Sequence, residues 1–198
     1  MPEAEPLTND WTMWIQTLPS ASVSRRPDGA LVVRRTDARP ATVMEAIGED
    51  IFVVTEEDGS WPARFAGLAL AGAVVRTRQT LLHFPRAGRR FRGEPCWYSP
   101  ALRSSKPSKA KYGRMNVSLA VAEGLGRHVS TTRRGKGGVS MPTHRVSFFV
   151  FHGAAPQLGT VDHACETPAC ANPLHLDDMT EEDNAARRAE KLSRIRRT

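Results

Sequence analysis

The chain has 198 residues, of which 40% are apolar and 25% charged. This composition is typical of folded proteins and excludes a disordered chain, and the length suits one ordinary domain with a smaller second one. No apolar run approaches the roughly 18 residues of a membrane-spanning helix, and the acidic opening lacks the basic stretch of a secretory signal. We therefore expect an intracellular protein without membrane contact.

The net charge of +7 is unevenly distributed. Residues 101–150 hold ten Lys and Arg and a single acidic residue, a local charge of +9. A concentrated positive segment is typical of proteins that bind a polyanion, and nucleic acid is the polyanion we expect. The alternative is a solvated basic surface with no partner.

Residues 1–88 predict a small β-rich module. A short helix is expected at 11–18, and the turn signals at 27–29 and 57–59 separate β-rich runs. The apolar segment 66–84 fits neither the helical nor the strand period, so both remain open. Chain breakers and cations at 85–90 place a domain boundary after residue 88, although this stretch could equally be a basic hairpin loop.

Residues 89–198 form the second predicted domain. Residues 112–117 predict a strand, whereas 104–111 and 133–138 predict basic loops that let cations approach phosphates. The alternative is that these loops are merely disordered in solvent. The candidates for nucleic-acid contact are Lys109, Lys111, Arg114, Arg133, Arg134 and Lys136.

A metal site is predicted near the C-terminus. Cys165, Cys170 and His175 are separated by four residues at each step, so the chain can loop around one ion. Structural Zn²⁺ is tetrahedral, and Cys96 is the remaining cysteine available as a fourth ligand. A disulfide between Cys165 and Cys170 is the alternative, but it would leave an odd thiol and require an oxidising compartment.

A second group of polar residues flanks this loop. Asp162 and His163 end a predicted strand, and a second strand is expected at 174–177. Thr180 is a good N-cap for the helix that carries Asn184. This strand–strand–helix unit could bring Asp162 and Asn184 to one hard cation, Mg²⁺ or Mn²⁺, with the His163 imidazole beside it.

In combination these motifs resemble the HNH, or His-Me finger, endonucleases, and especially the zinc-containing group of phage HNH proteins and intron-encoded homing endonucleases. The shared pattern is an Asp-His pair, CxxxxC, NPxHL and a downstream Asn. Upstream landmarks extend the likeness over about residues 94–190. They are Cys96-Trp97, Tyr112-Gly113-Arg114, Thr143-His144-Arg145 and Phe151-His152-Gly153.

The resemblance implies an α+β fold, with a ββα-metal catalytic domain and one structural zinc following the β-rich module. It implies that His163 is the general base, that Asp162 and Asn184 hold the catalytic metal, and that the zinc ligands are Cys96, Cys165, Cys170 and His175. Asn172 would tie together the loop between the strands, and His144 would lie near the active site. Residues 146–151 correspond to a helix of that family, but their Val and Phe content could form a strand.

The expected activity is metal-dependent cleavage of double-stranded DNA by a cytoplasmic protein of bacterial or phage type. Hydrolysis by one cation and a His base would leave a 5′-phosphate and a 3′-hydroxyl, with Arg133 or Arg134 near the scissile phosphate. The biological role of such an enzyme would be either restriction of foreign or modified DNA, or homing. The N-terminal module would recognise the target or form a homodimer. The alternative is a zinc-stabilised nucleic-acid-binding protein without nuclease activity.

Overall fold

The computed structural model describes residues 21–35, 41–47, 50–98, 112–127 and 138–195. The predicted helix at 11–18 and the predicted loops at 104–111 and 133–138 lie outside these ranges, as do the candidates Lys109, Lys111, Arg133, Arg134 and Lys136. The chain forms two compact units, Met1–Gln79 and Thr80–Thr198. The boundary predicted from the sequence, after residue 88, falls inside strand β6 of the second unit.

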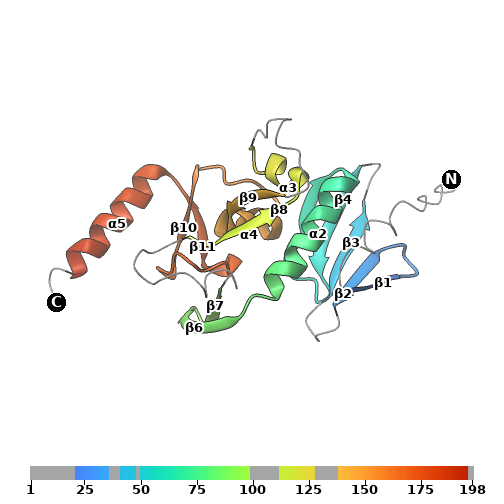
Figure 1. The fold of residues 1–198 in the computed structure, drawn as a ribbon, viewed down its shortest axis with the longest axis horizontal. Helices are drawn as coiled ribbons and strands as arrows, with labels where there is room; N and C mark the ends of the chain where they lie inside the picture. The colour runs from blue at the N-terminus through green and yellow to red at the C-terminus, as the bar shows by residue number, and fades with distance from the viewer. Residues whose placement is uncertain (1–20, 36–40, 48–49, 99–111, 128–137, 196–198) are drawn as a thin grey trace. The chain divides into compact units, whose positions relative to one another are not determined.

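The first unit contains a five-stranded antiparallel sheet in the order β1-β2-β3-β4-β5. Figure 1 labels β1 to β4 of this sheet. The strands are Ala21–Arg25, Leu31–Arg35, Thr42–Ala46, Ile51–Glu56 and Ala63–Ala66. The predicted turns join β1 to β2 and β4 to β5. Gly29 and Gly59 adopt φ of +88° and +80° there, which glycine tolerates without strain. The structure confirms the predicted β-rich module.

The segment left open by the sequence forms helix α2, Leu68–Leu82. Ala71, Val74, Val75 and Arg78 are buried at helical spacing, with at most 3% of each exposed. The helical spacing of buried residues could not be recognised from the sequence, because Arg78 and the equally buried Gln79 are polar. Periodicity analysis reads polar residues as outward-facing, so it could not place this face.

Hydrogen bonds satisfy these buried polar side chains of α2. Arg78 donates to the Trp61 carbonyl at 3.0 Å and pairs with the Glu56 carboxylate at 3.4 Å. Glu56 also accepts from the Thr42 hydroxyl at 3.2 Å, and Gln79 donates to that hydroxyl. Burial raises the pKa of Glu56 to about 7, although the Arg78 charge opposes this shift.

The described part of the second unit contains three separate two-stranded antiparallel sheets. They are β6–β7 (Arg86–Phe91 and Glu94–Trp97), β8–β9 (Arg114–Val117 and Val139–Pro142) and β10–β11 (Thr160–His163 and Leu176–Met179). The helices are α3 (Leu119–Gly124), α4 (Thr143–His152), the 3₁₀ turn η3 (Pro173–His175) and α5 (Glu181–Ile195). None of the helices in the described ranges is long and apolar enough to cross a lipid bilayer.

The cations of the basic stretch at 85–90 lie in a strand and not in a loop, since β6 spans Arg86–Phe91. The hairpin turns at Arg92 and Gly93, which both have positive φ values of 51° and 85°. Two positive φ angles in succession match the twist of a tight hairpin, so the cations before the turn belong to β6. The alternative of a basic loop at 85–90 is therefore wrong.

The Val- and Phe-rich segment 146–151 lies in helix α4 and does not form a strand. Val146, Phe149 and Val150 are buried at helical spacing, and this packing outweighs their β-propensity. Gly153 ends the helix with φ of +79° and donates its N–H to the Phe149 carbonyl at 2.9 Å.

The C-terminal elements form a strand–strand–helix unit. In the β10–β11 register, Asp162 lies opposite Asp177. Thr180 caps α5 by accepting a hydrogen bond from the Asp183 N–H at 3.0 Å, as predicted. The second strand begins at residue 176, two residues later than predicted, because the Asn172 side chain accepts from Leu174 N–H at 3.0 Å and starts a 3₁₀ turn.

Candidate functional site

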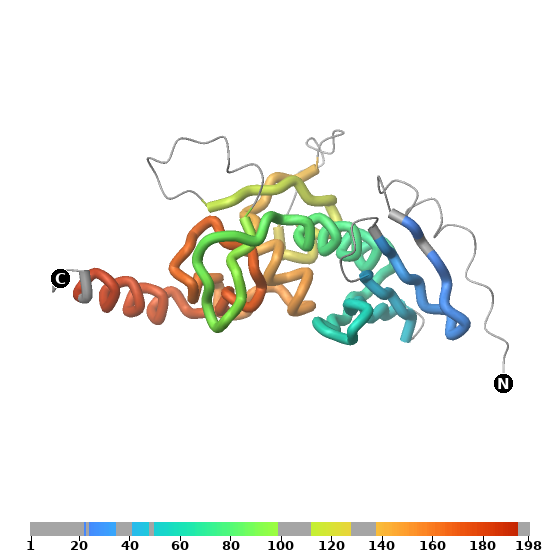
Figure 2. Tube along the Cα trace, turned by 90° about the horizontal axis from the view of Figure 1, so that it is seen from below, coloured from blue at the N-terminus to red at the C-terminus, as the bar shows by residue number. Residues whose placement is uncertain are grey.

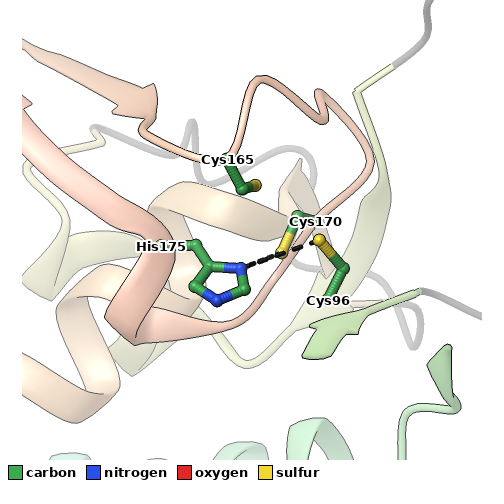
Figure 3. Close-up of side chains that lie close together, drawn as sticks. All are labelled: Cys96, Cys165, Cys170 and His175. Carbon is green, nitrogen blue, oxygen red and sulfur yellow. Dashed lines mark hydrogen bonds between the residues drawn. The ribbon is translucent and has the colours of Figure 1, made fainter. Parts of the chain in front are cut away.

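Three cysteines and one histidine form a buried cluster in the second unit (Figure 3). The ligand atoms of Cys96, Cys165, Cys170 and His175 lie within 4.8 Å of one another, and each residue is at most 1% exposed. His175 Nδ1 lies 3.4 Å from Cys170 Sγ and 3.7 Å from Cys96 Sγ. Zinc bond lengths of roughly 2.3 Å to sulfur and 2.0 Å to nitrogen in a tetrahedron require about 3.5 Å between such atoms. The donor set and its spacing therefore fit a structural zinc.

Three separate elements supply the cluster. Cys96 lies on β7, Cys165 and Cys170 lie in the loop after β10, and His175 lies in η3. The β7 strand runs beside that loop (Figure 2), because Tyr98 forms a β-bridge with Cys170 and the Ala171 N–H donates to the Trp97 carbonyl at 2.8 Å. Backbone pairing thus brings Cys96 to cysteines about 70 residues later.

The His175 ring is oriented for metal binding. Its Nε2 lies 3.2 Å from the Phe91 carbonyl oxygen. Because a carbonyl can only accept, Nε2 carries the proton and Nδ1 presents a lone pair to the thiols. A backbone carbonyl that fixes the tautomer in this way is common for histidines that bind metals.

All three cysteines are reduced, so the alternative disulfide between Cys165 and Cys170 is not formed. The thiols influence one another strongly. A hydrogen bond with Cys170 lowers the pKa of Cys165 to about 5, and the same interaction and burial raise the pKa of Cys170. The cluster therefore favours one thiolate even before a cation binds.

Asn172 links the two segments that supply the cysteines. Its side-chain amide donates to the Pro95 carbonyl of β7 at 2.8 Å, and its oxygen accepts from Leu174 N–H. The residue is completely buried. Ser147 of α4 holds the same loop by donating to the Ala171 carbonyl at 2.6 Å.

His163 is the last residue of β10 and is 5% exposed. Its Nε2 lies 3.1 Å from the carbonyl oxygen of Cys170. The His144 ring lies 4.9 Å from the His163 ring, and the Tyr112 ring lies 5.0 Å from His144 and 5.8 Å from His163. Three rings thus gather next to the cysteine cluster.

Both histidines are held neutral. Burial lowers the pKa of His163, and burial together with the nearby His163 lowers the pKa of His144 to about 3. The Nδ1 atom of His144 is buried without a hydrogen-bond partner. Both rings are therefore uncharged at physiological pH.

His163 and Tyr112 line a cavity of about 330 Å³. Asp162, Glu166 and Asp177 contribute carboxylates to its wall. The cavity is also lined by four cations, three of them from α5, namely Arg92, Arg187, Arg188 and Lys191. An anionic ligand entering it would meet a neutral imidazole and several cations together.

Asp162 and Asn184 have different surroundings. Arg187 donates to Asp162 and to Asp177, both at 3.0 Å, and these hydrogen bonds raise the pKa of Arg187 against the effect of burial. Asn184 lines a second cavity of about 600 Å³ beside Thr160, and its Oδ1 is buried without a hydrogen-bond partner. The orphaned oxygen suits a cation ligand, whereas the Asp162 carboxylate is occupied by an arginine.

Sequence reasoning did not select Arg187, Asp177 or Tyr112 as site residues. Arg187 follows Asn184 by one helical turn, and Asp177 lies opposite Asp162, but that register is known only once the hairpin is built. Arg114, a predicted DNA contact, is exposed and donates to Ser140 of β9 at 2.8 Å and 3.1 Å. Its contact with DNA stays a prediction.

Comparison of the chain with protein families, curated proteins and solved structures finds no match. The resemblance to HNH endonucleases therefore rests on the motif residues of the sequence alone.

Proposed function

We propose that this chain is a metal-dependent endonuclease of the HNH type that hydrolyses phosphodiester bonds in double-stranded DNA. The observation that carries the proposal is the hydrogen bond between His163 Nε2 and the Cys170 carbonyl. A carbonyl can only accept, so Nε2 holds the proton of the neutral ring and Nδ1 is left as a base. A neutral imidazole beside a cation-lined cavity suits removal of a proton from an attacking water.

The cysteine cluster supports this role of His163. Cys170 contributes its thiol to the cluster and its carbonyl to the His163 ring. Zinc bound by Cys96, Cys165, Cys170 and His175 would fix the loop that sets the tautomer of the base. Zinc would then be structural, and its loss would disturb the base without direct chemistry at the metal.

The cavity cations support phosphate binding. Arg92, Arg188 and Lys191 line the space next to His163 and would attract the DNA backbone. Asp162 and Asn184 would hold Mg²⁺ or Mn²⁺, since carboxylate and amide oxygens are ligands of hard cations. Bound there, the cation would supply positive charge to stabilise the leaving oxygen. The products would carry a 5′-phosphate and a 3′-hydroxyl.

One observation favours a second candidate, a zinc-stabilised nucleic-acid-binding protein without nuclease activity. The Asp162 carboxylate is ion-paired with Arg187, which would block a metal ligand if the pair were permanent. In either case the N-terminal unit would supply target recognition or dimerisation. The biological setting of a nuclease would be restriction of foreign or modified DNA, or homing.

The two candidates are separated by incubating the zinc-loaded protein with methylated and unmethylated plasmid, with and without Mg²⁺. The nuclease proposal expects Mg²⁺-dependent linear or nicked products whose 5′ ends need dephosphorylation before kinase labelling. A difference between the two plasmids would indicate sensitivity to modification. Binding of plasmid without any cleavage in Mg²⁺ or Mn²⁺ would favour the second candidate.

A further inference from the structure

Arg187 joins both strands of the β10–β11 hairpin to helix α5. It donates to Asp162 of β10 and Asp177 of β11, which lie directly opposite each other in the strand register. Like charges at directly opposed positions destabilise a hairpin. Arg187 therefore serves as a shared counter-ion for two carboxylates that would otherwise repel each other.

The remaining carboxylate of the cavity is also paired. Glu166 lies 3.4 Å from Lys191 and 3.2 Å from Arg89. Each carboxylate that lines this cavity thus has a cationic side chain as a partner. A metal ion that takes Asp162 must compete with Arg187 for it.

The ion pair is suited to exchange. The Arg187 side chain is 41% exposed and that of Asp162 is 21% exposed. Ion pairs of this accessibility contribute little net stability, because water solvates both partners well once they separate. Asn184 precedes Arg187 by three residues on α5, but it lines the second cavity whereas Arg187 lines the first. The Oδ1 of Asn184 is buried without a partner in the arginine-paired state.

We propose that Arg187 is an internal competitor of the divalent cation at Asp162, and that displacement by the cation frees its guanidinium to bind a phosphate of the DNA. This inference rests on the proposed function, since it concerns the same metal site. Arg187 is then a positioning residue that links cation binding at Asp162 to binding of a DNA phosphate. By reciprocity, DNA that attracts Arg187 strengthens cation binding, and the cation strengthens DNA binding.

The test is Mn²⁺ binding to the zinc-loaded full chain, followed by electron paramagnetic resonance. Arg187→Gln should bind Mn²⁺ about fivefold more tightly than the unaltered chain, because a pair of this exposure competes only modestly. Arg188→Gln is the matched control, since it removes the same charge from the neighbouring residue of the same cavity. Arg188→Gln should change the Mn²⁺ affinity by less than about twofold, which is the effect we expect from removing one positive charge that does not pair with Asp162.

Further variants separate the possible failures. Asp162→Asn should weaken Mn²⁺ binding and abolish the effect of Arg187→Gln in the double variant. If Arg187→Gln binds less zinc or unfolds, Arg187→Lys replaces it, since lysine keeps the charge but lacks the fork that can serve two carboxylates. The lysine variant should bind Mn²⁺ with an intermediate affinity.

Suppose that Asp162→Asn and Asn184→Ala both weaken Mn²⁺ binding. Equal effects of Arg187→Gln and Arg188→Gln on Mn²⁺ affinity would then overturn the role of Arg187 and leave the proposed metal site intact. Mn²⁺ binding that neither Asp162→Asn nor Asn184→Ala alters would overturn the metal site itself. A non-cleavable DNA duplex should tighten Mn²⁺ binding in the unaltered chain and have less effect in Arg187→Gln. Equal tightening in both would overturn the proposed link to phosphate.

Discussion

The two units stabilise their buried polar groups in different ways. The first unit packs helix α2 with a five-stranded sheet, and Arg78, Glu56, Thr42 and Gln79 satisfy one another within it. The described part of the second unit has three separate two-stranded sheets, and its cysteines converge on a single cluster. A two-stranded hairpin is marginal by itself in water.

The contrast indicates where each unit obtains its stability. A sheet with a covering helix buries a continuous apolar core and needs no external ligand. Short hairpins that meet at thiols and an imidazole gain much more if a metal ion joins them, because the free energy of metal binding becomes folding free energy. We therefore expect the first unit to fold without metal and the second to depend on it.

The largest expected effect comes from Cys170→Ser. Removing one ligand should abolish stoichiometric zinc binding and cost the second unit on the order of 10 kcal/mol, the scale of structural zinc sites. Hydrogen exchange followed by mass spectrometry resolves the units. Amides of β10, β11 and α4 should lose protection, whereas those of β2–β4 provide the internal control. Unchanged protection throughout would contradict the metal dependence.

The next effect is the pH dependence of the first unit's stability, which arises from buried Glu56 beside Arg78. Between pH 4.5 and about 7, folded Glu56 retains a proton that the unfolded chain has released, so stability falls as the pH rises through this range. The raised pKa corresponds to about 3 kcal/mol. Glu56→Gln should remove this dependence, as measured by denaturant unfolding of the first unit at pH 5 and pH 8.

Glu57→Gln is the control for this prediction, because Glu57 is exposed and pairs with Arg34 at the surface. It should leave the pH dependence of the unaltered chain in place. A steeper loss of stability at high pH in Glu56→Gln would show that the ionised Glu56–Arg78 pair stabilises the unit, contrary to this account.

The smallest of these effects is expected for Asn172→Ala. The variant leaves the Pro95 carbonyl and the Leu174 N–H without their partner, which should cost about 1–3 kcal/mol. Zinc affinity should fall by about 10- to 100-fold, because the loop that carries Cys170 is no longer tied to β7. A competition titration with a chromogenic chelator measures the zinc affinity. Asn116→Ala, at an exposed position of β8, should bind zinc like the unaltered chain.

Much of this architecture was predictable because local chemistry fixes it. The spacing of Cys165, Cys170 and His175 forces a loop around one centre, and Thr180 marks the start of α5. The turns at Gly29 and Gly59 are set by residues that tolerate positive φ. In each case a few neighbouring residues determine the conformation.

The remainder depends on contacts between distant residues. Helix α2 was hidden because Arg78 and Gln79 face inward, and their partners lie on strands 22 and 37 residues away. The helical state of 146–151 follows from burial and not from propensity. The Arg187 bridge required the register of β10 with β11, which no local pattern specifies.

The most direct test of the central claim is the cleavage rate of His163→Ala, measured under single-turnover conditions with plasmid and Mg²⁺. His152→Ala is the matched control, because His152 is an exposed histidine at the end of α4. Loss of the base should lower the rate about 10²- to 10⁴-fold, while zinc content and DNA binding remain close to those of the unaltered chain. Cleavage by His163→Ala at the rate of His152→Ala would contradict the assignment of His163 as the general base.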